Sequence, residues 1–148
     1  MTSRDGSLTG GGTSARIHEI RVIFGDTDQM GVVYYANYLR YFESARAAYW
    51  RELGRTYHDL VAWDVALPVV EASCQYRRSS HYEDLLHVET WISELRQASM
   101  RFSYRITREA VLIAEGMTRH AIVGSNGRPR AAPPQLLASI PPVPPKPA

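Results

Sequence analysis

The sequence predicts an α+β fold in which an antiparallel sheet of five strands wraps around one long helix. Three observations support this fold. One strand-like stretch comes first, a single long helical stretch follows it, and four strand-like stretches then come in succession. Regular alternation of strands and helices, which is typical of a parallel sheet, is missing. A chain of 148 residues suits one domain with a sizeable core.

The first strand is predicted around Ile20, Val22 and Phe24, which recur with a period of two. The central helix is predicted over residues 36–53, where apolar residues recur at helical spacing. Gly54 then supplies a C-terminal stop. A helix of about 18 residues is about 27 Å long, because each residue rises 1.5 Å, and this length is enough to cross an antiparallel sheet.

A short second helix is predicted over residues 57–63. The four later strands share an alternation of apolar and polar residues, and they are predicted over residues 70–76, 86–92, 100–106 and 112–123. A turn at residues 125–127 ends the last of them. An exposed sheet edge and a single covering helix favour a dimer, or a tetramer of two dimers.

The two ends of the chain differ in composition from its centre. Residues 1–14 are predicted to form a flexible N-terminal arm, because they are rich in glycine, serine and threonine and lack the apolar run of a signal peptide. Residues 15–132 form the predicted domain. Residues 133–148 are predicted to be an extended proline-rich tail, because proline lacks the N–H that helices and central strands need.

Composition excludes several classes of protein. A net charge of +2 without a basic run argues against nucleic acid binding. No stretch approaches the roughly 18 apolar residues of a membrane span. The single cysteine, Cys74, requires no oxidising compartment, so the chain is predicted to be cytoplasmic. The five histidines show no metal-ligand spacing, and no metal is expected.

Chemically useful residues concentrate in residues 24–38. Asp26 and Asp28 lie two apart between Gly25 and Gly31, directly before the predicted helix. A carboxylate beside a helix N-terminus can attack a carbonyl, or activate water against it, while the free N–H groups of the helix polarise the carbonyl oxygen. The spacing alone equally fits an aspartate that only shapes the turn or caps the helix.

This segment resembles the N-terminal motif of hotdog-fold acyl-CoA thioesterases of the 4-hydroxybenzoyl-CoA thioesterase family. The residues that carry the resemblance are Gly25-Asp26-Thr27-Asp28, Gly31-Val32-Val33-Tyr34 and Asn37-Tyr38. The likeness continues through residues 39–43 and, more weakly, from residue 82 to residue 133. The resemblance implies a hotdog fold, meaning a sheet wrapped around a central helix, and hydrolysis of an acyl-CoA without a cofactor.

The resemblance also implies roles for individual residues. Asp28 matches the catalytic aspartate, which acts as nucleophile or as general base. The backbone N–H of Tyr35 is expected to polarise the thioester oxygen, and Asp26, Gly31 and Asn37 match supporting positions. Many relatives that act on aliphatic acyl-CoAs have histidine where this chain has Tyr35, which favours a bulkier or aromatic acyl group here.

Other assignments are less specific. Arg96 and Arg130 are candidates for binding the phosphates of coenzyme A. Glu43, in the middle of the helix, fits an ion pair or a contact between subunits better than catalysis. Two alternative functions stay open: release of a fatty or polyketide chain from an acyl carrier protein, and acyl-thioester binding without catalysis. The histidine-centred motif of hotdog dehydratases is not seen.

Overall fold

The computed structural model describes residues 14–143. It contains one five-stranded antiparallel sheet with the strand order β1-β3-β4-β5-β2. The strands are β1 (Arg16–Arg21), β2 (Val69–Tyr76), β3 (Leu85–Arg96), β4 (Ser99–Arg108) and β5 (Val111–Ala121). The helices are the 3₁₀-helix η2 (Phe24–Asp26) and the α-helices α2 (Asn37–Glu52), α3 (Tyr57–Ala62) and α4 (Pro134–Ser139).

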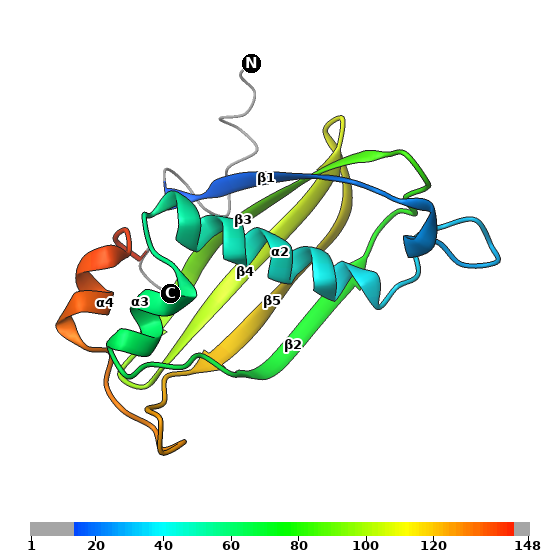
Figure 1. The fold of residues 1–148 in the computed structure, drawn as a ribbon. Coiled ribbons are helices and arrows are strands. Elements are labelled where there is room, and N and C mark those ends of the chain that lie inside the picture. Colours follow the sequence, from blue (N-terminus) through cyan, green and yellow to red (C-terminus); the bar gives the residue numbers. More distant parts are fainter. Residues whose placement is uncertain (1–13, 144–148) are drawn as a thin grey trace, which may run out of the picture.

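Helix α2 lies across one face of the sheet, while α3 and α4 lie together at one end of the molecule (Figure 1). This arrangement confirms the predicted hotdog fold. The central helix, α3 and the four later strands fall within a few residues of their predicted bounds. The predicted N-terminal arm lies outside the described residues except for Ser14.

The core lies between α2 and the facing side of the sheet. Alternate residues of β4 are buried, from Met100 to Ile106, while the residues between them point to the other side. From α2, Phe42 stacks on Tyr104 with ring centroids 4.2 Å apart. The adjacent strand β5 has Gly116 at this place, where a Cβ atom would come within 2.9 Å of the Phe42 ring and would collide with the carbonyl of Ser73. The glycine therefore lets α2 lie close to the sheet.

The first strand lies earlier in the chain than predicted. It covers Arg16–Arg21, and Phe24 is in η2 with 73% of its surface exposed. After Val22 the backbone turns, because the N–H of Asp26 donates to the carbonyl of Ile23 (3.0 Å). The alternation of apolar residues continues through this turn, which explains why the pattern placed Phe24 in the strand.

The prediction that residues 133–148 form an extended tail is wrong for Pro134–Ser139, which are helical. Pro134 begins the helix α4, which proline tolerates because the first helical N–H has no partner within the helix. Leu136 is fully buried in the core, and Ser139 accepts a hydrogen bond from Arg55 Nε (2.9 Å). Residues 144–148 lie outside the described part, and the boundaries of the three predicted segments stay predictions.

A chain of hydrogen bonds crosses the core. Arg46 Nη1 donates to Tyr104 Oη (3.0 Å), which bonds to Thr118 Oγ1 (2.6 Å). Thr118 in turn bonds to His120 Nε2 (2.8 Å), and His120 Nδ1 lies 2.9 Å from the carbonyl of Leu67. A neutral imidazole protonated on Nδ1 satisfies all these contacts. Each hydroxyl then donates to the next group along the chain, Thr118 donates to Nε2, and Nδ1–H donates to the carbonyl of Leu67.

No helix in residues 14–143 is long and apolar enough to cross a membrane.

We expect Leu136→Ala to lower the free energy of unfolding by about 2–5 kcal/mol, since a fully buried leucine side chain would leave a cavity. The neighbouring Leu137 is 46% exposed, so Leu137→Ala should change the free energy of unfolding by less than about 0.5 kcal/mol. Urea unfolding of the two variants measures the difference. Equal effects would show that α4 does not dock on the core.

We expect His120 to make stability depend on pH. Burial lowers the pKa of His120 below its ordinary value of 6.5, because the interior disfavours the charged imidazolium. The folded state therefore favours the neutral ring. Its contribution to stability is complete above pH 6.5 and is lost as the pH falls through that value toward the lower pKa of the folded state.

The variant His120→Gln isolates this contribution, because an amide can keep both hydrogen bonds but does not titrate. Urea unfolding at pH 7.5 and pH 5.0 should show a larger loss of stability in the wild type than in the variant. His18, whose pKa burial also lowers, contributes equally to both proteins. The same loss in both would mean that His120 carries no pH-dependent stability.

Candidate active site

The loop before α2 presents the carboxylate of Asp28. The N–H of Asp28 donates to the carbonyl of Val32, and the carbonyl of Asp28 accepts from the N–H of Gly31, both at 2.9 Å. Gly31 has a φ of 81°, a conformation that glycine adopts without strain. One carboxylate oxygen, Oδ1, accepts the N–H of Met30 at 2.9 Å. The other, Oδ2, makes no hydrogen bond or ion pair within residues 14–143.

The N-terminus of α2 supplies hydrogen-bond donors. The chain reaches the helix through Tyr34, whose N–H donates to the carbonyl of Asp26 (2.9 Å). The next two N–H groups, of Tyr35 and Ala36, have no acceptor among the described residues. Helix N-termini leave such groups unpaired and carry a partial positive charge. Both features suit the stabilisation of a developing oxyanion.

Asp28 and Tyr35 line the same cleft, which has a volume of about 490 Å³. Its wall is largely aromatic. Tyr34 and Tyr35 pack with ring centroids 4.8 Å apart, and Tyr76 of β2 meets Tyr38 edge-on at 5.5 Å. Tyr76 Oη also donates to the carbonyl of Tyr35 (3.2 Å), which ties β2 to the start of α2. The structure thus brings the two predicted catalytic groups together.

Three tyrosines of this wall, Tyr34, Tyr38 and Tyr76, have a raised pKa, so their hydroxyls stay protonated at neutral pH. Burial is the main cause that raises the pKa of Tyr76, to about 12, and burial likewise raises the pKa of Tyr38. A hydrogen bond with Tyr35 raises the pKa of Tyr34. These groups can therefore donate hydrogen bonds to a ligand but are poor general bases.

Asp26 lies beneath the loop and supports it. Its side chain is buried, and Oδ2 accepts the hydroxyl of Tyr41 at 2.7 Å while Oδ1 lies 3.3 Å from Arg40 Nη1. Its carbonyl accepts the side-chain amide of Asn37 at 2.9 Å. The carboxylate also helps to raise the pKa of Tyr41, after burial as the main cause. These contacts agree with supporting positions for Asp26 and Asn37, although the roles of all the predicted site residues stay predictions.

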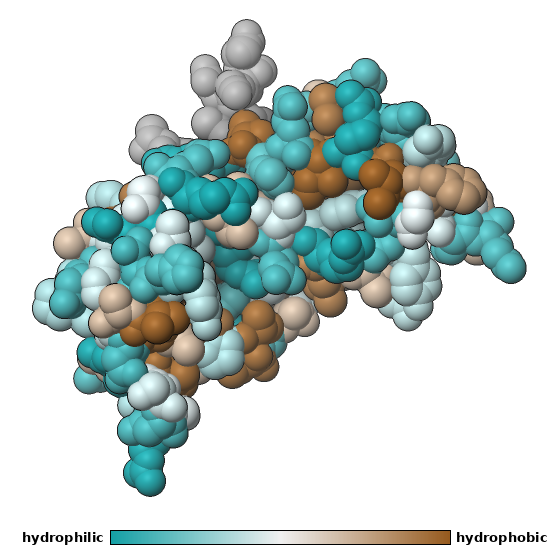
Figure 2. Space-filling model, viewed as in Figure 1, coloured by the Kyte–Doolittle hydropathy of each residue, from teal (hydrophilic) through white to brown (hydrophobic). Residues whose placement is uncertain are grey.

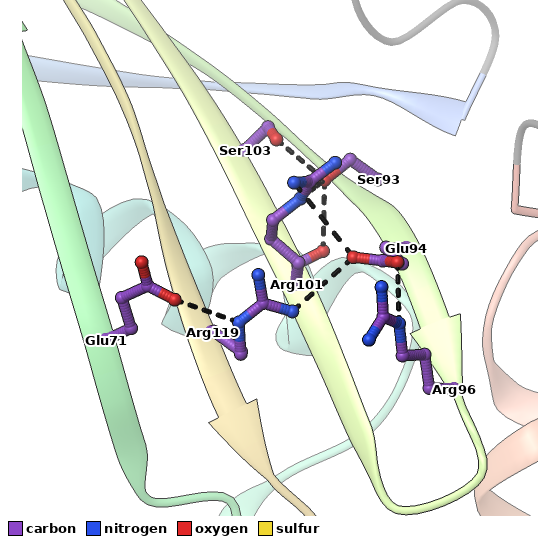
Figure 3. A network of polar contacts seen from close by, with 7 residues as sticks. All are labelled: Glu71, Ser93, Glu94, Arg96, Arg101, Ser103 and Arg119. Atoms are coloured by element: carbon purple, nitrogen blue, oxygen red, sulfur yellow. Dashed lines mark hydrogen bonds and ion pairs between the residues drawn. The ribbon is translucent and has the colours of Figure 1, made fainter. Parts of the chain in front are cut away.

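The two arginines predicted to bind coenzyme A lie elsewhere. Neither lines the cleft of Asp28. Arg96 Nε donates to Glu94 at 2.7 Å, in a network that includes Arg101, Arg119 and Glu71 on the face of the sheet away from α2 (Figure 3). Arg130 Nη1 donates to the carbonyls of Trp63 (3.1 Å) and Asp64 (2.9 Å). Both guanidinium groups are thus engaged within the chain.

A segment that borders the cleft on the side of β2 was not predicted from the sequence. Arg77, Arg78 and Ser79 follow this strand directly and line the cleft. Two consecutive arginines after a strand were a usable signal, but 16 arginines are spread along the chain, so this pair did not stand out. Glu43, which the sequence placed outside catalysis, lines other clefts and not this one.

Hydrophobic side chains reach the surface around the loop before α2. Phe24 and Met30 are 73% and 81% exposed. In Figure 2 hydrophobic patches lie among polar ones at the end of the molecule that carries η2.

Within residues 14–143 no three histidine, cysteine, aspartate or glutamate side chains are grouped so that they could hold a metal ion.

The fold and the cleft together define a hotdog protein whose cleft is lined by Asp28 and by Tyr35, close to the N-terminus of α2. The chain belongs to the thioesterase-like superfamily, whose profile matches residues 22–145. The predicted resemblance to hotdog acyl-CoA thioesterases is confirmed.

Individual proteins support this assignment. The acyl-CoA thioesterase YbgC of Haemophilus influenzae is 34% identical over 123 residues, which cover 82% of this chain and 90% of that protein. Slr0204, a 1,4-dihydroxy-2-naphthoyl-CoA thioesterase from Synechocystis, is 26% identical with a TM-score of 0.77, and the match covers 84% of this chain and 93% of Slr0204. A 4-hydroxybenzoyl-CoA thioesterase shares the fold at 22% identity and a TM-score of 0.79, covering 86% and 99% of the two chains.

Proposed function

We propose that this protein is an acyl-CoA thioesterase in which Asp28 carries the chemistry. One observation supports this most directly: Asp28, which has a carboxylate oxygen without a partner among the described residues, and Tyr35, whose N–H before α2 is unpaired, line one cleft. The named relatives hydrolyse coenzyme A thioesters, in agreement with this chemistry. A carboxylate, water and peptide N–H groups suffice for hydrolysis, so we expect no cofactor.

Two routes fit the geometry. In the first, Asp28 Oδ2 attacks the thioester carbon, and the N–H of Tyr35 stabilises the oxyanion that forms. The carbon–sulfur bond then breaks, coenzyme A leaves as a thiolate that takes up a proton, and water hydrolyses the mixed anhydride. In the second, Asp28 removes a proton from a water molecule as that water attacks the same carbon. Both routes give the free acid and coenzyme A.

We further propose that the acyl group is aromatic. Four tyrosines line the cleft, and aromatic rings pack well against planar ligands in offset or edge-on contacts. Tyrosine hydroxyls can donate hydrogen bonds to polar substituents of such a ring. The relative Slr0204, which is named for a naphthoyl substrate, supports the same choice.

We also propose that two copies of the chain pair through β2, as a homodimer or within a homotetramer. Within residues 14–143, no strand pairs with the outer edge of β1 or of β2. The edge strand β1 contains Arg16, His18, Glu19 and Arg21, and charged edges resist pairing. In β2, by contrast, Val69 and Val70 are 47% and 60% exposed and Glu71 is the only charged residue.

A cytoplasmic location is part of the proposal, because the single cysteine requires no oxidising compartment.

We expect Asp28→Asn to lower kcat for an aromatic acyl-CoA by at least about a hundredfold, because the amide keeps the size of the side chain but loses its charge and basicity. Steady-state release of coenzyme A measures the rate. Asp26→Asn is the matched control: it should cost less activity and should lower the stability instead, because Tyr41 and Arg40 lose a buried carboxylate partner. Turnover of Asp28→Asn close to that of the wild type would remove Asp28 from the mechanism.

We expect sedimentation equilibrium at micromolar concentration to give the mass of a dimer or a tetramer. Val70→Lys should shift the equilibrium toward the monomer, since it adds a charge to the edge of β2. Ile17→Lys, on the already charged edge strand β1, should have a smaller effect on association. A fully active monomer would contradict the proposed pairing.

A further inference from the structure

Coenzyme A carries its phosphates at the far end of the pantetheine arm, away from the thioester. A cleft that binds it therefore needs a cation at the mouth rather than beside the reacting carboxylate. Two cationic side chains line the cleft of Asp28, those of Arg77 and Arg78, and both are exposed.

The two arginines differ in their partners. Arg77 donates twice to Glu115, from Nη2 at 2.9 Å and from Nε at 3.2 Å, so its charge is balanced within the chain. The guanidinium of Arg78 makes no hydrogen bond or ion pair with any residue between 14 and 143. Arg78 is therefore the cation of this cleft whose charge stays free for a ligand.

The backbone that carries Arg78 is held firmly. The N–H groups of Arg77 and Arg78 donate to the carbonyl of Ile113 at 2.8 and 3.1 Å. One residue on, the carbonyl of Ser79 accepts Arg108 Nη1 at 3.0 Å, and Arg108 also bonds to Asp84 at 2.9 Å. These contacts fix the position of the segment on the sheet.

The same segment is tied to the loop of Asp28. The carbonyl of Ser80 accepts the N–H of Val33 at 2.8 Å, and the buried hydroxyl of Ser80 lies 2.7 Å from Tyr38 Oη. Val33 belongs to the loop that Asp28 begins, and Tyr38 lies in the first turn of α2. The place of the free arginine is thus set relative to the carboxylate and to the helix N-terminus, while its side chain can still move to meet a phosphate.

We propose that Arg78 binds a phosphate group of the coenzyme A moiety at the mouth of the cleft. Arg78 would then determine the affinity for coenzyme A and not the rate of the chemical step. This inference rests on the proposed acyl-CoA hydrolysis and adds to it a binding residue that replaces Arg96 and Arg130 in that role.

The test compares two thioesters of the same aromatic acid, one with coenzyme A and one with pantetheine, which has no phosphate. For the coenzyme A thioester, Arg78→Ala should raise KM roughly five- to tenfold and leave kcat within about twofold, the size expected of one charged contact in a partly exposed site. For the pantetheine thioester, neither constant should change. Arg78→Lys should recover part of the lost affinity, because it restores the charge without the paired donors.

Arg51→Ala is the matched control. Arg51 is an exposed arginine of α2 that does not line this cleft, so the variant loses the same charge and should keep the KM of the wild type. An unchanged KM in Arg78→Ala would overturn the proposal. An equal rise in KM for the pantetheine thioester would also overturn it. The same holds if KM for the coenzyme A thioester rose in Arg96→Ala or Arg130→Ala and not in Arg78→Ala.

Equilibrium binding of coenzyme A itself separates this inference from the proposed function. Titration calorimetry should show a Kd roughly five- to tenfold higher for Arg78→Ala than for the wild type. If the wild type hydrolysed no acyl-CoA, the proposed function would fail, yet this measurement would still decide whether Arg78 binds coenzyme A. Equal Kd values in the two proteins would overturn the inference even in an active enzyme.

Discussion

The packing of α2 against the sheet is the contact on which the rest of the molecule depends. Phe42 lies over Gly116 and stacks on Tyr104, so the distance between helix and sheet is set by one aromatic ring and one missing side chain. Interiors are close-packed, and a displaced ring here would move the whole helix. Because the free N–H groups of the site belong to the N-terminus of α2, the geometry of the cleft follows from this contact in the core.

The two aspartates of the loop differ in their burial and in their hydrogen-bond partners. Both oxygens of Asp26 have partners, Tyr41 and Arg40, and the residue is buried, so it fixes the loop. Asp28 uses one oxygen to hold its own orientation through the N–H of Met30 and leaves the other free in the cleft. A carboxylate that is held in place but not fully paired needs little reorganisation to react, which is the usual requirement for electrostatic catalysis.

Elements that follow from the periodicity of apolar residues were predicted from the sequence. Features that depend on contacts within the folded chain were not. The helical spacing of residues 36–53 placed α2 almost to the residue, because one face of a helix in a core must be apolar. The end of β1 and the helix α4 were misplaced, since a turn at Ile23 and a proline at the first position of a helix leave the local pattern unchanged. The motif of the family pointed to Asp28, whereas the partners of Arg77, Arg78, Arg96 and Arg130 come only from the folded chain.

The open side of the cleft connects the proposed chemistry with the proposed association. Tyr35 and Tyr76 are 60% and 48% exposed although they form the wall beside Asp28, and Tyr76 lies on the same strand as the exposed Val70. In a single chain this wall is therefore in contact with water, which weakens the electrostatic contacts beside it. A second copy paired along β2 would cover these tyrosines and lower the local dielectric constant around the helix N-terminus. Association through β2 would then also serve the proposed reaction, because it would exclude water from the side of the cleft that one chain leaves open.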